Sequence, residues 1–561
     1  MFYMVACLLA GPALKDGRPP PSSHHAKRAL RDGGGCGKLW DVFKCPKPWI
    51  GRFKVLFNSY AFIFVFLPCS LILYYAAAKF GPRAQVLILA IVSVVFYCGW
   101  DLRYLPLLLG SILCNFVIAR MILLSANRKG LSKFFLILGI VVNLCALGYY
   151  KYADFFIENI NDVFGYSFLM VNVILPLGIS FFTFTQTAFL VDSYRGKSDE
   201  PDFIQYLSFV TYFPHLIAGP ILHHHEIIPQ FKRGVALQAC WIAPGLAMFS
   251  IGLAKKVIIA DTFGSIAKPI FDSFAAGGQA LTMMDAWLGA ISYTFQLYFD
   301  FSAYCDMAVG VSLMFGIYIP LNFNSPYKAA SIIDFWRRWH MTLSKYLRDY
   351  IYIALGGNRL GNYRRFQNLM ITMVVGGFWH GAGWTFIIWG ALHGAYLIVN
   401  HFWRSLFNGS RETVVGRWAG RVLTFLCVVV AWVFFRSDSV TSALAMLNTM
   451  VSAPAGLSLN VEKSVTTIII PQAILDAGFQ VSANYVALAT MAAGLCIVWM
   501  FRNTQELVFR SSPWDTSLES ASAPTGWTAR WQLLPISSAA LLLGLVALIA
   551  APPGEFLYFN F

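Results

Sequence analysis

The chain has 561 residues, of which 58% are hydrophobic and only 12% are charged, and its mean hydropathy is +0.61. Soluble domains carry roughly 25% charged residues, so this composition excludes a soluble globular protein and indicates an integral membrane protein. The net charge of +15 would suit nucleic acid, but no basic domain stands apart from the apolar sequence, so we predict no nucleic-acid partner. The 11 cysteines include no CxxC pair, which indicates neither a disulfide framework nor a zinc site.

The first 54 residues differ from the rest of the chain. They contain the run PPPSSHHAKRALRDGGGCGK, whose Pro, Gly and basic residues are typical of disorder. Hydrophobic sequence begins abruptly at Val55, and the codon GUG both encodes Val and starts bacterial genes. We therefore expect residues 1–54 to be a disordered extension outside the natural protein, and residues 55–561 to form one multi-pass membrane domain.

Apolar runs then recur along the whole chain. They span 60–75, 84–100, 105–124, 134–149, 168–191, 203–222, 241–260, 286–297, 308–319, 369–399, 422–435, 485–501 and 533–550. A membrane helix needs roughly 20 apolar residues, and several runs are shorter. We expect an all-α membrane fold with about ten to thirteen crossings and some re-entrant pieces.

Charged loops predict the orientation of these helices. Basic residues gather at 127–133, at Lys232 and Arg233, and at Lys255 and Lys256, and short loops of this kind stay in the cytoplasm. The segment 437–484 is long and nearly uncharged, as an exported loop can be. We therefore expect that segment on the periplasmic side.

A strongly cationic block interrupts the apolar sequence at 334–365, DFWRRWHMTLSKYLRDYIYIALGGNRLGNYRR. Composition alone favours a cytoplasmic loop that follows the positive-inside rule. The alternative is a site for an anionic cofactor, because guanidinium groups bind phosphates in a bidentate manner. Coenzyme A would suit such a site if the block is helical and lies with His340 beside a membrane cavity. The residues predicted to bind it are Trp336, Arg337, Arg338, Trp339 and Arg348.

A second block, GGFWHGAGWTFIIWGALHG at 376–394, places His380 among glycines and tryptophans. An ionisable group in hydrocarbon costs several kcal/mol unless it is partnered, which makes this histidine a functional candidate. Imidazole, with an ordinary pKa of about 6.5, can take a proton from a hydroxyl and return it to a leaving thiolate. The glycines allow either close helix packing or close approach of an extended ligand. His393, 13 residues further on, falls on another helical face and is interpreted as structural.

Six blocks of the chain resemble a known family of membrane enzymes. They are LPLGISFFTFTQTAFLVDSYRGK, FPHLIAGPI, QLYFDFSAYCDMAVGVSLMFGI, NFNSPY and the two histidine blocks above. The family is that of the membrane-bound O-acyltransferases, and the resemblance is strongest to its bacterial branch for alginate and cellulose O-acetylation. The resemblance covers residues 55–561 and implies a helical fold around a central tunnel. It also implies that His380 is essential and that His340 is a second membrane-buried histidine.

The chain ends in FLYFNF at 556–561. An interfacial aromatic belt is one interpretation of this ending. The ending also resembles a C-terminal motif of polymer-acylating members and their partners, which implies that Tyr558 carries the acyl group. A phenol with a pKa of about 10 is a better leaving group than a sugar hydroxyl with a pKa of about 16, so an acyl-tyrosine keeps much of the transfer potential of a thioester. Asn560 stands where that motif usually has Gln.

Two other clusters are weaker candidates. The run of histidines at 223–225, followed by Glu226, could bind a metal, but adjacent helical residues point in different directions, so we predict no metal site. Asp300 and Asp306 are six residues apart, which does not support a carboxylate pair that shares a proton. We expect these two carboxylates to orient polar groups near the tunnel.

The sequence thus predicts a membrane O-acetyltransferase of the bacterial inner membrane that serves O-acetylation of an exported polysaccharide. Acetyl-CoA is the expected donor substrate, with no permanently bound cofactor. His380 is the expected general base on the accepting hydroxyl, and His340 assists it. The expected partners are a periplasmic acetyltransferase or polymer-modifying protein, an exopolysaccharide export complex and membrane lipids.

Two alternatives remain from the residues alone. One is a transporter or flippase that uses the buried histidines as a proton relay. The other is a structural scaffold of an export complex.

Overall fold

The computed structural model describes residues 55–198, 202–277, 281–407, 413–454, 483–509, 534–550, 554 and 556–557. The chain divides into two units, Met1–Arg52 and Phe53–Phe561, and every described helix belongs to the second unit. The predicted disordered extension and Tyr558 lie outside the described residues.

The second unit is built from helices, and its described ranges contain no β-strand. Its first half comprises α3 (Leu67–Ala77), α4 (Pro82–Cys98), α5 (Leu105–Leu124), α6 (Lys129–Leu147), α7 (Ala153–Phe164), α8 (Ile179–Tyr194), α9 (Phe203–Thr211), α10 (Phe213–Leu216) and α11 (His224–Arg233). Its second half begins with α12 (Ala239–Ala254), α13 (Asp261–Ala275), α14 (Met283–Met314), α15 (Ile332–Trp336), α16 (Met341–Tyr346), α17 (Gly361–His380) and α18 (Trp384–Leu406). The last helices are α19 (Val414–Arg436), α20 (Val440–Ser452), α23 (Ala483–Met500), α24 (Thr504–Val508) and α25 (Leu534–Ala550).

Several helices meet the requirements for crossing a bilayer. Among the described residues, five helical stretches are long and apolar enough: Phe62–Phe80, Leu102–Leu124, Lys129–Phe164, Cys240–Ala275 and Val414–Arg436. Shorter apolar helices lie at Pro82–Cys98, Val440–Ser452, Leu488–Met500 and Pro535–Ile549. The predicted fold class, an all-α integral membrane protein, is confirmed.

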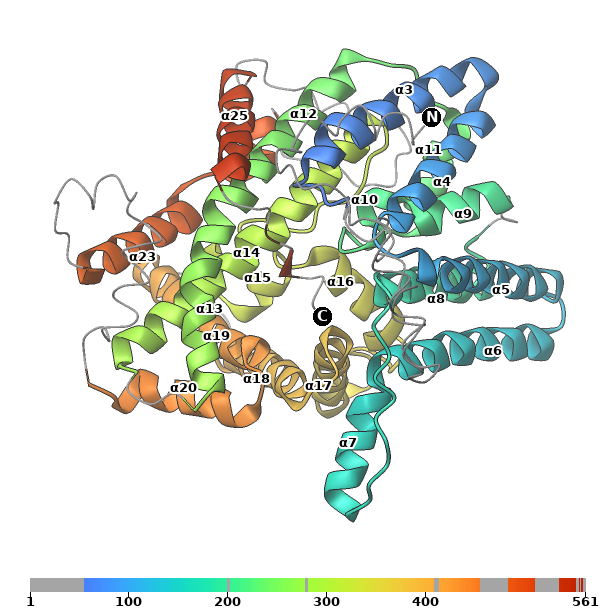
Figure 1. Ribbon diagram of the computed structural model, residues 1–561. Coiled ribbons are helices and arrows are strands. Elements are labelled where there is room, and N and C mark those ends of the chain that lie inside the picture. Colours follow the sequence, from blue (N-terminus) through green and yellow to red (C-terminus); the bar gives the residue numbers. More distant parts are fainter. Residues whose placement is uncertain are drawn as a thin grey trace, which may run out of the picture. The chain divides into compact units, whose positions relative to one another are not determined.

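Helix α14 is the core of this unit. Nearly all of its 32 residues are buried, and α12 and α13 lie beside it (Figure 1). Small residues allow this packing: a Cβ added at Gly310 would meet the carbonyl oxygen of Gly245 on α12 at 2.5 Å. Glycines of this kind let two helix backbones approach closely where apolar lipid gives no other drive for association.

Three predicted segments are divided differently in the structure. The apolar run 369–399 is not one helix, because α17 ends at His380 and α18 begins at Trp384 after an extended link. The run 168–191 starts without helix, and α8 begins only at Ile179, after Gly178 adopts a left-handed φ of 73°. The long segment expected outside the membrane starts as helix α20.

Lys255 and Lys256 do not mark a cytoplasmic loop, so that prediction is wrong. Both lie on a π-helical turn, η6 (Lys255–Ala260), and Lys256 is buried. Their ammonium groups pair with Asp306 and Asp300 of α14. Burial of these charges inside the protein is tolerated because each has an opposite charge beside it.

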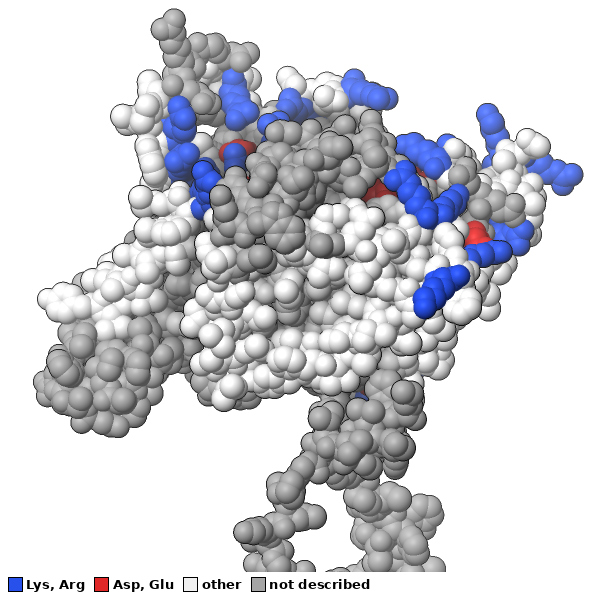
Figure 2. Space-filling view, turned by 90° about the horizontal axis from the view of Figure 1, so that it is seen from above, with Lys and Arg blue, Asp and Glu red and all other residues white. Residues whose placement is uncertain are grey.

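Other basic residues follow the positive-inside pattern more closely. Figure 2 shows lysines and arginines gathered along one edge of the molecule, with a wide surface of uncharged residues beside that edge. Lys129, Lys133, Lys232 and Arg233 are exposed. A charged rim beside an apolar surface is the distribution expected where a membrane meets water.

Candidate active site

The two histidines singled out from the sequence lie together inside the fold. The ring centroids of His340 and His380 are 6.3 Å apart, and these residues are 0% and 4% exposed. His380 is the last residue of α17, and His340 directly precedes α16. The fold therefore brings into one buried site two imidazoles that are 40 residues apart in the chain.

A strained backbone and a fixed acceptor orient His340. Its φ of 42° and ψ of 54° lie in the left-handed region, which is uncommon for a residue with a Cβ and concentrates at functional sites. The Oδ1 atom of Asn322 lies 3.1 Å from His340 Nδ1 and also accepts hydrogen bonds from the N–H and hydroxyl of Thr342. Since that oxygen is an acceptor, Nδ1 of a neutral His340 carries the proton, and the ring presents its lone pair on Nε2.

Aromatic rings enclose His380. Its ring centroid lies 4.9 Å from Trp379, 5.2 Å from Trp389 and 5.2 Å from Phe435. The Trp389 ring also contacts the ring of His393 at 4.9 Å. Such a cage keeps bulk water away from the imidazole, and electrostatic interactions are stronger in the lower dielectric that results.

Lys151 is a site residue that sequence reasoning missed. Its Nζ donates hydrogen bonds to the carbonyl oxygens of Trp379, at 2.6 Å, and His380, at 3.0 Å. These bonds hold the end of α17, where the helix leaves carbonyl groups without intrahelical donors. The signal in the sequence is a lone lysine in the aromatic run YYKY, on the π-helical turn η5 (Gly148–Tyr152), and π-helical turns are frequent at functional sites.

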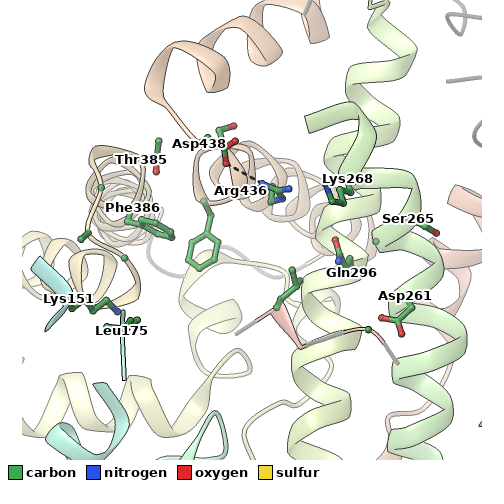
Figure 3. Close-up of a pocket in the computed structure, with 18 of the residues that line it drawn as sticks. Lys151, Leu175, Asp261, Ser265, Lys268, Gln296, Thr385, Phe386, Arg436 and Asp438 are labelled. Atoms are coloured by element: carbon green, nitrogen blue, oxygen red, sulfur yellow. Dashed lines mark ion pairs between the residues drawn. The ribbon is translucent and has the colours of Figure 1, made fainter. Parts of the chain in front are cut away.

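Two cavities meet this region. The smaller, of about 310 Å³, is lined by His380, Trp379, Lys151 and residues 174–181 among others. The larger, of about 1050 Å³, is lined by Lys151, Gly381 and residues of α13, α14, α18 and α19. Figure 3 shows Lys151 and Leu175 on one side of this larger cavity, across from Gln296 and Asp261. Lys151 therefore lines both cavities, whereas His380 lines the smaller one and the next residue, Gly381, lines the larger one.

Leu557, near the end of the chain, is at the wall of the larger cavity. The peptide N–H of Leu557 donates a hydrogen bond of 2.9 Å to Asp300 on α14. The ring of Phe556 lies 4.8 Å from the ammonium of Lys256. Lys256 in turn bonds Asp300 at 2.6 Å and Asp261 at 2.7 Å. A buried ion-pair network thus fixes the residues just before Tyr558.

The residues predicted to bind coenzyme A are not on one helix. Helix α15 ends at Trp336, and the left-handed turn at His340 precedes α16, so the expected continuous helix is wrong. Trp339 is 2% exposed and packs against Trp432 at 5.0 Å between ring centroids. The indole N–H of Trp336 donates to His393 Nδ1 at 3.3 Å.

The arginines of this block lie nearer to solvent. Arg338 pairs with Asp334 at 2.8 Å, and Arg348 pairs with Asp349 at 2.7 Å. Arg337 and Arg348 are exposed. Binding of an anionic donor by these arginines stays a prediction.

His393 and the glycines have packing roles. His393 lies on α18, a different helix from His380, and the earlier assumption of one helix with two faces is wrong. A Cβ added at Gly377 would meet the carbonyl oxygen of Phe386 at 2.3 Å, and one at Gly390 would meet that of Met373 at 2.4 Å. These two glycines therefore serve the close crossing of α17 and α18.

The histidine run lies away from this site, at the start of α11. His223 and His224 are buried, and His225 is exposed. Burial lowers the pKa of His223 to about 4, while the nearby Glu226 carboxylate opposes that shift. The imidazole of His223 is therefore neutral at physiological pH.

These observations define a class of protein: a helical membrane protein with a buried pair of histidines, one of which lines a cavity. This arrangement suits proton transfer during group transfer. Residues 134–437, more than half of the chain, match the membrane-bound O-acyltransferase family, MBOAT. The chain belongs to this family and is an O-acyltransferase. The resemblance predicted from the sequence blocks is confirmed.

Three relatives resemble the chain over most of its length. It is 39% identical over 544 residues to the "Peptidoglycan O-acetyltransferase" of Helicobacter pylori, covering 91% of this chain and 98% of the relative. It is 43% identical over 405 residues to the "Probable alginate O-acetylase AlgI" of Pseudomonas aeruginosa, covering 71% and 75%. The protein of the same name in Pseudomonas syringae pv. tomato is 37% identical over 542 residues, covering 90% and 100%. These similarities favour the enzyme over the transporter and scaffold alternatives.

Proposed function

We propose that the protein transfers an acetyl group from cytoplasmic acetyl-CoA through the bacterial inner membrane, for O-acetylation of a polysaccharide outside it. The observation that carries this proposal is the pair His340 and His380, buried together with His380 at the wall of a cavity. A paired imidazole site in apolar surroundings suits proton transfer between a hydroxyl and a thiolate.

The proposed reaction needs one proton carrier and no oxidant. His380 takes the proton of the accepting hydroxyl while the hydroxyl oxygen bonds to the carbonyl carbon of the thioester. The carbon–sulfur bond then breaks, and the proton passes to the departing thiolate, which leaves free coenzyme A and an O-acetyl ester. His340 lies beside His380, with 6.3 Å between their ring centroids, and would assist the transfer through its lone pair on Nε2. Lys151 is a positioning residue, because its bonds go to the peptide carbonyls at the end of α17.

Tyr558 is the proposed first acceptor. Leu557, the residue before it, is hydrogen-bonded to Asp300 and lines the larger cavity, which Gly381 next to His380 also lines. This supports delivery of Tyr558 to the larger cavity, close to His380. The phenolic oxygen would carry the acetyl group, and a periplasmic acetyltransferase or polymer-modifying partner would move it to polymer. Arg337, Arg338 and Arg348 would attract the phosphates of the donor at the cytoplasmic side.

The final acceptor is proposed from the relatives. Two of them are named for alginate, and a Helicobacter pylori protein that matches nearly its full length is named for peptidoglycan. An exported polysaccharide of the alginate kind is the first candidate. Cell-wall peptidoglycan is a second, favoured by that full-length similarity. The acetate content of each polymer after deletion of the gene separates the two.

The enzyme reaction is tested with purified protein in liposomes and acetyl-labelled acetyl-CoA. We expect release of free thiol and label bound to the protein. Tyr558→Phe removes only the phenolic oxygen, so it should abolish the bound label. Thiol release with no label on the wild-type protein would overturn the carrier role, and an absence of thiol release from wild type would overturn acetyl-CoA as donor.

A further inference from the structure

A group of metal-ligating side chains lies outside the catalytic region. It comprises Asp192 near the end of α8, His223 just before α11 and His225 in the first turn of α11. One ligand atom from each residue lies within 4.8 Å of the other two. If the three histidines were successive residues of one helix, their side chains would point in different directions and could not share an ion. His223 instead has an extended backbone, with φ −98° and ψ 142°, and its ring centroid comes within 5.3 Å of that of His225.

Burial makes this group unusual. Asp192 and His223 are each 4% exposed, yet Nε2 of His223 has no hydrogen-bond partner among the described residues. Buried polar side-chain atoms in native proteins nearly always have a partner, and one that lacks a partner is explained by a missing ion or water. His225 is exposed, so an ion could reach the group from solvent.

Tyr350 sets the chemical state of His223. Its hydroxyl lies 2.6 Å from Asp192 Oδ2, to which it donates, and 3.3 Å from His223 Nδ1. A hydroxyl has one proton, so the tautomer that donates from Nδ1 to the Tyr350 oxygen satisfies this contact and places the lone pair of the neutral imidazole on Nε2. Metal-bound histidines are commonly held in this way, with the second ring nitrogen donating to a fixed partner.

Of the two carboxylates near these histidines, Asp192 and Glu226, only Asp192 belongs to the proposed ligand group. Glu226 is engaged elsewhere: it bonds Lys345 Nζ at 2.7 Å and accepts the peptide N–H of His223 at 3.2 Å. The set that remains is two imidazoles and the Asp192 carboxylate, whose Oδ2 atom also lies 3.6 Å from His224 Nδ1. Imidazole ligands suit zinc and other first-row transition metals, whereas calcium and magnesium prefer oxygen ligands alone.

We propose that Asp192, His223 and His225 bind a divalent transition-metal ion of the zinc class. The ion joins α8 to the start of α11 and keeps a coordination position open on the side of His225. Tetrahedral zinc with bonds of about 2.0–2.1 Å places its ligand atoms roughly 3.4 Å apart, so the group closes when the ion binds. The exposed His225 ring is the member best able to move.

The test uses the full chain, purified through a tag that contains no histidine and stripped with chelator. Co²⁺ is then added as a spectroscopic probe for zinc. We expect stoichiometric binding with the visible absorption of a four-coordinate cobalt site, displaced by Zn²⁺. His225→Ala should lose this absorption and at least tenfold in affinity, and Asp192→Asn should do the same. The matched control is His401→Ala, which removes a histidine near Arg365, outside the group.

Stability gives a second readout that does not depend on catalysis. An ion that binds only the folded protein raises the thermal unfolding midpoint in a concentration-dependent way. Zn²⁺ should raise the midpoint of wild type and of His401→Ala, and should leave that of His225→Ala unchanged. Because His225 is exposed, this variant is expected to fold even if Asp192→Asn does not. Equal cobalt spectra and equal zinc-induced shifts in wild type and His225→Ala would overturn the proposal, as would no stoichiometric binding by wild type.

Discussion

The histidine pair and the ion-pair network of α14 use buried polar groups in opposite ways. In the network, Lys256 stands between Asp300 and Asp261, so its charge is balanced at short range. Around the His380 ring the neighbours are aromatic side chains, which carry no opposite charge, and the nearby cation Lys151 bonds the peptide carbonyl of His380. Fully paired charges hold a structure in place, whereas an imidazole among rings can change its protonation state during a reaction. The difference is consistent with a network that serves as scaffold and with the proposed role of the histidine pair as the reactive part.

The ion-pair network of α14 also explains how Phe556 and Leu557, near the end of the chain, are held in place. Asp300 accepts the peptide N–H of Leu557, and the Phe556 ring packs on Lys256 and on Tyr304. A charged residue left unpaired in such a place would be costly, so the network and the chain end support each other.

Removal of one charge from the network should have the largest effect on stability. In Asp300→Asn, Lys256 loses its buried carboxylate partner, and its other carboxylate partner, Asp261, has a side chain that is 33% exposed. Loss of one partner of a buried ion pair costs about 3–5 kcal/mol, and we expect a decrease of that size in the free energy of unfolding in detergent. The decrease is measured by denaturant titration followed by tryptophan fluorescence.

Lys268→Ala is the matched control for this change. Lys268 pairs with Asp272 on the same helix, but the two side chains are 72% and 45% exposed. Exposed pairs of this spacing contribute about 0.3–0.5 kcal/mol, so this variant should be nearly as stable as wild type. Equal losses in the two variants would remove the distinction between a scaffold network and ordinary surface charges.

Removal of Asn322, the hydrogen-bond acceptor that orients His340, should have the next largest effect. This effect is on the rate of acyl transfer and not on stability. Asn322→Ala removes the oxygen that fixes the proton on Nδ1, and misplacement of a catalytic group by about 1 Å can cost up to about 100-fold. We expect acyl transfer to slow by roughly ten- to 100-fold, measured as release of free thiol. Asn322→Asp keeps an acceptor oxygen and should recover part of the rate. A rate in Asn322→Ala equal to that of wild type would show that His340 needs no fixed tautomer.

The smallest effect is expected at the exposed arginines. Arg348→Ala removes a guanidinium that pairs with Asp349, and surface changes of this kind usually alter stability by less than about 0.5 kcal/mol. If Arg348 attracts the donor phosphates, KM for acetyl-CoA should rise a few-fold with little change in kcat. The measurement is initial rate against acetyl-CoA concentration, and an unchanged KM would remove Arg348 from the donor site.

Composition and the spacing of apolar runs were enough to predict the fold class. The predicted helix limits failed where local geometry departs from the hydrophobic pattern. The break between α17 and α18 lies in an unbroken apolar run, because the turn depends on three residues around Gly381 and not on polarity. Lys255 and Lys256 resemble loop charges in the sequence, since their partners on α14 are 51 and 44 residues away along the chain.

The site was predictable only in part, because several of its contacts join residues that lie far apart in the chain. Tryptophan and glycine neighbours mark His340 and His380 as unusual within an apolar chain. Nothing local indicates that Asn322 orients His340, or that Lys151 holds the end of α17 from 229 residues away. The ligand group at Asp192 escaped prediction because it depends on an extended residue next to a helix start.

The central claim is that His380 is the proton acceptor in acyl transfer. The direct test is the rate of thiol release from acetyl-CoA by purified His380→Ala, compared with wild type and with His401→Ala, after circular dichroism has shown that all three are folded. General base catalysis contributes about 10²–10⁴-fold, so we predict that His380→Ala is slower by at least about 100-fold and that His401→Ala equals wild type. Turnover by folded His380→Ala at the wild-type rate would contradict the account.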